Sequence, residues 1–229
     1  MNYKRFSYSL LAIIITIILP LSILYYLSGA GDYLIKIRKY YPQVDSTLSG
    51  NVMTYDTSFY TIPDFSLLNN TGDSIYREDL HGQFLIVDFF FTRCPTICPE
   101  MSNSMYDVQE TFDEIDEVKL LSISIDSEYD TPDILSKYSR KYDAKPDKWL
   151  FLTGDKNKIH NLASMGFKLS AVQVAEGKDG ITHSDRLVLV DKEGIIRGYY
   201  HGTDDDEVDK LIVELRMLIK ESRLKNENL

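Results

Sequence analysis

The chain has 229 residues, of which 44% are hydrophobic, so it is long enough for one well-buried domain with additional segments. Its formal net charge of -10 argues against nucleic acid as a partner, because phosphate backbones are bound by basic surfaces. The same acidity is compatible with a cationic partner or a metal. The sequence contains no internal repeat and no long low-complexity tract.

The N-terminal segment is strongly apolar. Residues 10–27 contain no charged side chain, and neutral residues extend the run back to Ser7, which is enough for a helix that spans a bilayer. Signal-peptidase cleavage after Ala30 is the main alternative, but the run exceeds the roughly 7–15 apolar residues of a signal peptide. We therefore expect residues 1–30 to form a short tail and one N-terminal transmembrane helix, with residues 8–28 in the membrane.

The rest of the chain predicts an α/β fold behind a tether. Residues 31–58 are expected to be the tether, residues 59–221 the domain and residues 222–229 a C-terminal tail. The alternation of strands and helices predicts a central mixed sheet flanked by helices. The expected elements are an entry hairpin at 60–76, strands at 84–91, 118–126, 149–154, 186–191 and 195–200, and helices from 99, 132, 155 and the TDDDE run at 203–207.

The chain has two cysteines, Cys94 and Cys98, in the run FFFTRCPTICPEMS after a predicted buried strand. Paired thiols form a disulfide, exchange one, or bind a soft metal. We expect a helix from Pro99 with Cys98 as its cap, and this helix N-terminus is expected to lower the thiol pKa. Strand, cysteine loop and helix form the nucleus of a thioredoxin-like fold. A structural disulfide is the alternative, although so short a bridge removes little chain entropy.

A histidine is the natural third partner for two thiols. His183 is the best placed, because it lies on the loop that enters a predicted core strand. His81 and His160 are expected on the surface and His201 in a turn. From position alone, however, a histidine is more often structural than a ligand.

Three runs in this order, FTRCPTICP, SISIDSEYDTPDILSKYSRKY and THSDRLVLVDKEG, resemble the Sco/SenC family of copper proteins. The resemblance covers residues 59–221 and implies a thioredoxin-like fold that is tethered to the cell membrane on the periplasmic, extracytoplasmic side. It implies copper, as Cu(I) and Cu(II), bound by Cys94, Cys98 and His183. The family serves assembly of the dinuclear copper centre of cytochrome c oxidase, so the implied partner is the copper subunit of that oxidase or another copper carrier.

The family's aspartate-rich motif falls on Asp126 and Asp130, which are expected to order the loop near the ligands rather than bind metal. Arg93 precedes the first cysteine and is a candidate to modulate its charge. The chemistry agrees with copper, since thiolates suit Cu(I) and an added imidazole makes Cu(II) tolerable. Zinc accepts the same ligands but usually takes a closed set of four when structural.

Functions of other classes compete with copper delivery. A thioredoxin-type reductase uses a two-residue spacer and a cis-proline, whereas the spacer here has three residues and all 7 prolines lie at or before Pro146. A peroxiredoxin-like peroxidase needs Thr or Ser and Pro where this chain has Phe91 and Val87. An oxidoreductase that uses Cys94 and Cys98 as a redox pair to keep the copper-site cysteines of oxidase reduced stays open, as does a redox sensor. A metallochaperone is the favoured interpretation.

Overall fold

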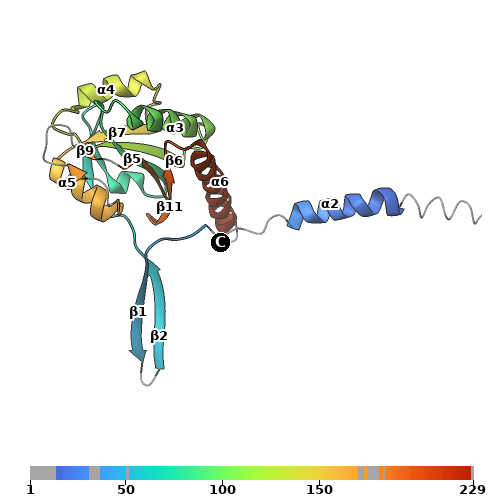
Figure 1. The fold of residues 1–229 in the computed structure, drawn as a ribbon. Coiled ribbons are helices and arrows are strands. Elements are labelled where there is room, and N and C mark those ends of the chain that lie inside the picture. Colours follow the sequence, from blue (N-terminus) through green and yellow to red (C-terminus); the bar gives the residue numbers. More distant parts are fainter. Residues whose placement is uncertain are drawn as a thin grey trace, which may run out of the picture. The chain divides into compact units, whose positions relative to one another are not determined.

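The computed structural model describes residues 14–30, 37–49, 52–169, 173–174, 181–182 and 184–227. The chain divides into two compact units, Met1–Lys36 and Ile37–Leu229 (Figure 1). In the first unit a π-helical turn, Ile14–Ile18, leads into helix α2, Leu19–Ala30. Within the described part of the chain, no helix combines the length and the apolar character that crossing a membrane requires.

The second unit contains the strands and helices of the folded domain. In chain order they are β1 (Pro42–Ser49), β2 (Val52–Phe59), β3 (Ser66–Asn69), β4 (Ser74–Tyr76), the 3-10 helix η2 (Arg77–Leu80), β5 (Phe84–Phe90), α3 (Ile97–Thr111), β6 (Val118–Ser124), α4 (Pro132–Lys141), β7 (Trp149–Thr153), α5 (Lys156–Asn161), the π-helical turn η3 (Leu162–Gly166), β8 (Gln173–Val174), β9 (Ile181–Thr182), β10 (Arg186–Val190), β11 (Ile196–His201) and α6 (Asp205–Glu227).

A mixed sheet forms the centre of this unit. Among the described residues it has seven strands in the order β11-β10-β5-β6-β7-β3-β4. Strands β5, β6 and β7 are parallel, whereas β10 is antiparallel to both β5 and β11, and β3 is antiparallel to both β7 and β4. The predicted entry hairpin, the predicted strands and the mixed character of the sheet are confirmed.

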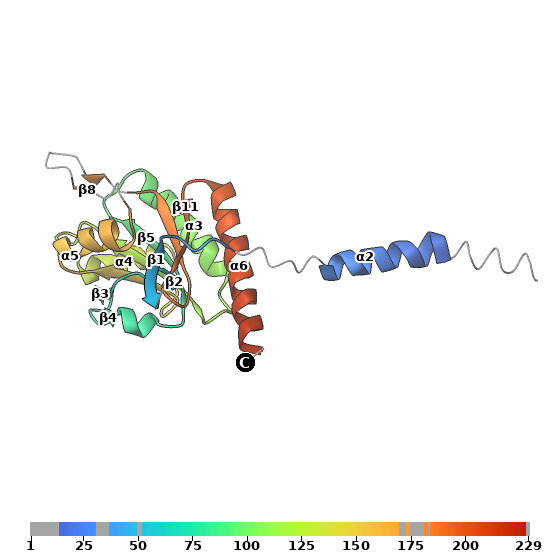
Figure 2. The same cartoon turned by 90° about the horizontal axis from the view of Figure 1, so that it is seen from below.

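Helices cover both faces of the sheet. Successive side chains of a strand point to opposite faces, so an apolar strand such as β5 serves two cores. Ile86 of β5 packs in a core with α3, α4 and α6, whereas Leu85 and Val87 join a core with α5 and η3. Figures 1 and 2 show α6 and α5 on opposite sides of the body. The predicted layers are therefore confirmed.

A second hairpin precedes the sheet, in residues for which the sequence analysis expected only a tether. Strands β1 and β2 pair antiparallel from Pro42 opposite Phe59 to Ser49 opposite Val52. They form a separate two-stranded sheet that does not pair with the seven-stranded one (Figure 1).

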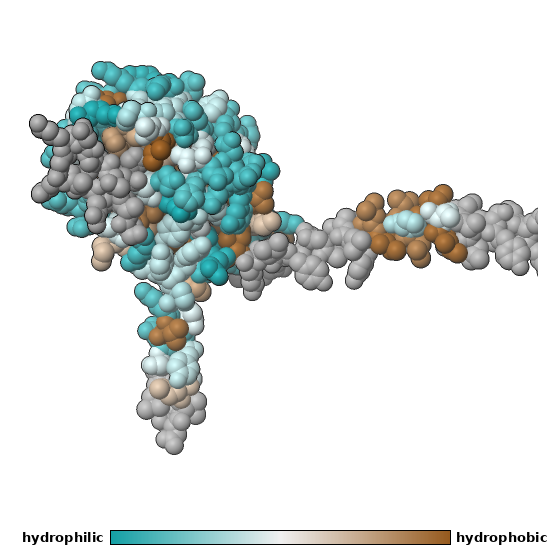
Figure 3. Space-filling view, in the orientation of Figure 1, coloured by the Kyte–Doolittle hydropathy of each residue, from teal (hydrophilic) through white to brown (hydrophobic). Residues whose placement is uncertain are grey.

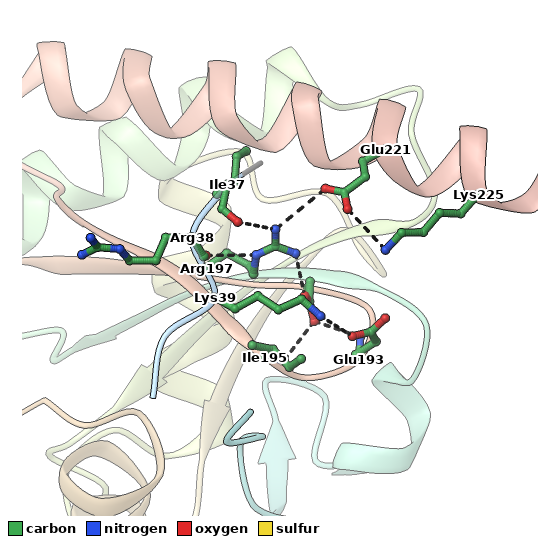
Figure 4. Close-up of polar contacts among 9 residues, drawn as sticks. Ile37, Arg38, Lys39, Glu193, Ile195, Arg197, Glu221 and Lys225 are labelled. Carbon is green, nitrogen blue, oxygen red and sulfur yellow. Dashed lines mark hydrogen bonds and ion pairs between the residues drawn. The ribbon is translucent and has the colours of Figure 1, made fainter. Parts of the chain in front are cut away.

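The chain enters the second unit through contacts with Arg197 of β11 (Figure 4). Arg197 Nη2 donates to the carbonyl of Ile37 at 2.7 Å and Nε to the carbonyl of Arg38 at 3.1 Å. Its Nη1 lies 2.9 Å from Asp191 Oδ2, and both charged side chains are almost fully buried. Glu221 of α6 lies 3.8 Å from Nη2. We call this group the Arg197 clamp; it fixes residues 37 and 38 to the end of the sheet.

Candidate metal centre

The two cysteines lie where β5 gives way to α3. Cys94 is on the loop after β5, 7% exposed, and Cys98 is in the first turn of α3, fully buried. Neither cysteine forms a disulfide, and the Cys94 thiol lies close enough to Cys98 to affect its pKa. The loop is held by the Cys94 N–H, which donates to the carbonyl of Phe91 at 3.2 Å, and by a contact of 3.7 Å between Cys94 Sγ and Thr96 Oγ1.

Helix α3 begins two residues earlier than the sequence predicted. Its first residue is Ile97, with Thr96 at the N-cap, so the prediction of Pro99 as the first residue and Cys98 as the cap is wrong. Proline is tolerated here because the first N–H groups of a helix have no partner within the helix. Cys98 is therefore the second residue of the helix, and its side chain is fully buried.

The predicted low pKa of Cys98 is also wrong for the metal-free thiol. Burial raises the pKa of Cys98 well above its usual value, and the neighbouring Cys94 and the negative charge of Asp88 raise it further. A helix N-terminus favours a negative charge by typically about 0.3–1 kcal/mol, whereas full burial can shift a pKa by several units. Desolvation therefore outweighs the helix dipole.

A buried carboxylate connects the start of the cysteine loop to the end of β6. Asp130 is fully buried and accepts hydrogen bonds from the Thr92 N–H at 3.0 Å and from Ser124 Oγ at 2.5 Å. The Thr92 hydroxyl donates to the other carboxylate oxygen. Thr92 lies two residues before Cys94, so these bonds fix the backbone as it approaches the first thiol.

Arg93 is held on the outer side of the same loop. Its Nη2 lies 2.5 Å from Asp126 Oδ2, and its guanidinium carbon lies 4.1 Å from the ring centroid of Tyr129. The Asp130 N–H in turn donates to the carbonyl of Asp126 at 2.9 Å. The structure thus brings Asp126 and Asp130 together with residues 92–94, and both aspartates bond to protein groups there.

Asp88 is a second buried carboxyl near the site, and it was not among the residues predicted to contribute to the site. It lies in β5, accepts a hydrogen bond from Ser122 Oγ at 2.5 Å, and Ser122 in turn accepts one from Trp149 Nε1 at 2.9 Å. Burial raises the pKa of Asp88 from 3.8 to about 7. The signal for it in the sequence was a single acid within an otherwise apolar strand.

His183 lies outside the described residues, so its distance to the thiols is not defined. The residues after it are fixed: the Gly202 N–H donates to the carbonyl of Asp185 at 2.7 Å, and His201 Nδ1 lies 2.6 Å from Asp185 Oδ2. Because β10 is antiparallel to β5, the start of β10 lies at the sheet edge where β5 ends toward Cys94. Within the described ranges, no group of three His, Cys, Asp or Glu side chains is placed to hold a metal.

Comparisons with known proteins agree with this arrangement. The profile of the SCO1/SenC family matches residues 54–220. A Bacillus subtilis protein described as "SCO1 protein homolog" is 33% identical over 170 residues, which are 73% of this chain and 87% of that protein. The structure of a SCO1/SenC family lipoprotein from Bacillus anthracis has a TM-score of 0.64 at 26% identity and covers 70% of this chain and 95% of its own.

Two further solved structures bear on the chemistry. BsSco, described as a member of the Sco family of cytochrome c oxidase assembly proteins with a disulfide switch, has a TM-score of 0.61 at 32% identity, over 69% of this chain and 93% of its own. The structure of Arabidopsis thaliana ScoI with copper bound has a TM-score of 0.59 at 25% identity. The match covers 71% of this chain and 99% of that protein's chain. These likenesses confirm the thioredoxin-like α/β fold. With the family profile covering most of the folded unit, the chain belongs to the SCO1/SenC family.

Proposed function

We propose that this chain is a membrane-tethered, extracytoplasmic copper-binding protein that supplies copper to the dinuclear copper centre of cytochrome c oxidase. The observation that carries the proposal is the pair of buried thiols, not joined by a disulfide, that lie between the end of β5 and the first turn of α3. Membership of the SCO1/SenC family supports it, as do the relative solved with copper bound and the relative described as an oxidase assembly protein.

The proposed ligands are Cys94, Cys98 and His183. Two thiolates suit Cu(I), and one imidazole extends the site to Cu(II). The raised pKa of Cys98 means that its proton must leave when the metal binds, so copper uptake releases protons. Asp130 and Asp126 act indirectly: the first fixes the backbone before Cys94, and the second holds Arg93 against Tyr129.

The anchor and the division of the chain are parts of the same proposal. We assign residues 1–30 to a short tail and a membrane anchor and residues 59–221 to the copper domain. Strands β1 and β2 lie within the tether predicted at 31–58, and α6 continues to Glu227 within the tail predicted at 222–229. The charge-free run of residues 10–27 supports an anchor. Protease added to spheroplasts should remove the domain, and protection of the domain in intact spheroplasts would overturn this placement.

Metal analysis of purified protein tests the ligands. The reduced wild-type chain should bind one copper, Cys98→Ser should lose it, and His183→Ala should weaken Cu(II) more than Cu(I), because Cu(II) has the stronger preference for nitrogen. His81→Ala, which removes an exposed histidine, is the matched control and should bind like wild type. Undiminished copper in Cys98→Ser would exclude this site.

A thiol–disulfide role is the second candidate, because the two thiols are neighbours and BsSco is described with a disulfide switch. In that role Cys94 and Cys98 would be the redox pair that keeps the copper-site cysteines of oxidase reduced. Deleting the gene should lower oxidase activity in either case. Restoration by added copper supports delivery, whereas restoration by excess reductant alone supports thiol reduction.

A further inference from the structure

The β1–β2 hairpin has one apolar face and one polar face. Its register places side chains of alternate residues on the same side of the two strands. The polar side carries Asp45 directly opposite Asp56. We call the other side the hairpin face; its described members are Pro42, Val44 and Ser46 of β1 with Met53, Tyr55, Thr57 and Phe59 of β2.

The hairpin face is open to solvent in the isolated chain. Val44 is 63%, Met53 54% and Tyr55 68% exposed, and Figure 3 shows hydrophobic residues on the surface of this hairpin. A two-stranded hairpin is marginally stable in water, so apolar side chains gathered on one exposed face indicate a surface that something else covers.

The base of the hairpin is firmly attached to the domain. The Tyr40 N–H donates to the carbonyl of Ile196 at 3.0 Å, the Tyr60 N–H to the carbonyl of Tyr41 at 3.1 Å, and the hydroxyls of Tyr41 and Tyr199 lie 3.1 Å apart. The Arg197 clamp holds the residues just before it. The clamp and the hairpin base therefore move with the sheet.

The clamp also shortens the connection to the apolar segment. Only residues 31–36 separate the end of α2 from Ile37, the first clamped residue. An extended residue spans at most about 3.6 Å, so covalent geometry allows about 25 Å between Ala30 and Ile37. Each eight-residue strand of the hairpin is about 27 Å long. If residues 8–28 lie in a bilayer, the hairpin is thus within reach of the lipid surface.

The size and chemistry of the hairpin face favour lipid over a protein partner. Three exposed side chains of this kind bury on the order of 400 Å², about half of what one partner contributes to a stable interface. A protein surface that is already tethered to the membrane can bind lipid with a much smaller buried area, because tethering raises the effective concentration of that surface at the membrane. Tyr55, with its apolar ring and polar hydroxyl, suits the membrane interface. The opposite face, with Asp45 and Asp56, would stay in water.

We propose that the hairpin face lies against the lipid surface, so that the domain has a membrane contact of its own in addition to the anchor. The proposal rests on the membrane anchoring proposed above but not on copper binding. It assigns a lipid-binding surface to β1 and β2, of which β1 precedes the residues matched by the family profile.

Tryptophan scanning of the full-length chain in phosphatidylcholine vesicles tests the proposal. Met53→Trp and Tyr55→Trp place the reporter on the hairpin face, and Thr54→Trp and Asp56→Trp place it on the opposite face as matched controls. The single native tryptophan, Trp149, is buried and gives the same background in every variant. Lipid brominated in its acyl chains should quench about half of the added emission at positions 53 and 55 and leave positions 54 and 56 nearly unchanged.

Each other outcome overturns the proposal in a distinguishable way. The same vesicles are also floated in a density gradient to test whether the protein is bound to them. If they float without the protein, both the anchor and the hairpin contact are wrong. Flotation with equal quenching at positions 53 and 54, or with none at either, overturns the lipid contact alone. Iodide, which quenches tryptophan that is exposed to water, is added as a second quencher. If neither brominated lipid nor iodide quenches the tryptophan at position 53, a second copy or another protein covers the hairpin face. Copper binding, measured on the same samples, reports separately on the proposed function.

Discussion

Replacing Asp88 with asparagine should stabilise the domain at neutral and alkaline pH. Asp88 is 1% exposed in the middle of β5, and its hydrogen bond from Ser122 Oγ does not compensate for the lost water. Burial therefore raises the pKa of Asp88 from 3.8 to about 7 in the folded chain.

The sign of the effect follows from proton linkage. Between pH 4 and pH 7 the folded chain keeps the Asp88 proton and the unfolded chain loses it, so the free energy of unfolding falls as the pH rises. Each pKa unit corresponds to about 1.4 kcal/mol, so a rise of about three units costs about 4 kcal/mol above pH 7. Asparagine has a similar shape and no proton to lose, so the variant escapes this cost.

Urea denaturation of the reduced, metal-free chain at several pH values measures the effect. The difference in unfolding free energy between Asp88→Asn and wild type should grow from near zero at pH 4 to about 4 kcal/mol at pH 8. Asp209→Asn, at an exposed position of α6, controls for the general loss of one negative charge. A difference that stays constant from pH 4 to pH 8 would refute the reasoning, since it would mean that Asp88 titrates alike in both states.

Three other substitutions test the contacts around the site and the clamp. Asp130→Ala should destabilise the domain by about 3 kcal/mol in urea denaturation, because the Thr92 donors lose their buried acceptor; a change as small as that of a surface variant would contradict this. Arg197→Met should cost about 3–5 kcal/mol by leaving Asp191 buried and unpaired, and should speed trypsin cleavage after Arg38; unchanged cleavage would show that the clamp does not restrain this segment. Arg93→Gln should change stability no more than a surface variant such as Asp209→Asn in the same assay, because the Arg93 side chain is half exposed to water; a clearly larger loss would contradict this.

The central sheet could be predicted because its strands carry their own signal. Runs such as residues 84–90 and 118–124 are apolar and rich in β-branched or aromatic residues, as strands buried on both faces must be. The β1–β2 hairpin was missed because its strands alternate apolar residues with serine, threonine and aspartate, which resembles a polar tether. The available signal was Gly50-Asn51 between the two runs, a dipeptide typical of two-residue hairpin loops.

The proximity of Cys94 and Cys98 could be predicted from their spacing, whereas the electrostatics of the pair could not. Spacing indicated that Cys94 and Cys98 act as a pair near a helix N-terminus, but the pKa of a thiol depends on the water around it, and burial is a property of the whole fold. Cys98 is fully buried in the first turn of α3, so its charged form lacks solvent. A bound soft cation would stabilise the thiolate, whereas an unliganded thiolate would remain unfavourable there. The burial that overturned the predicted pKa therefore favours metal binding over a standing thiolate nucleophile at Cys98.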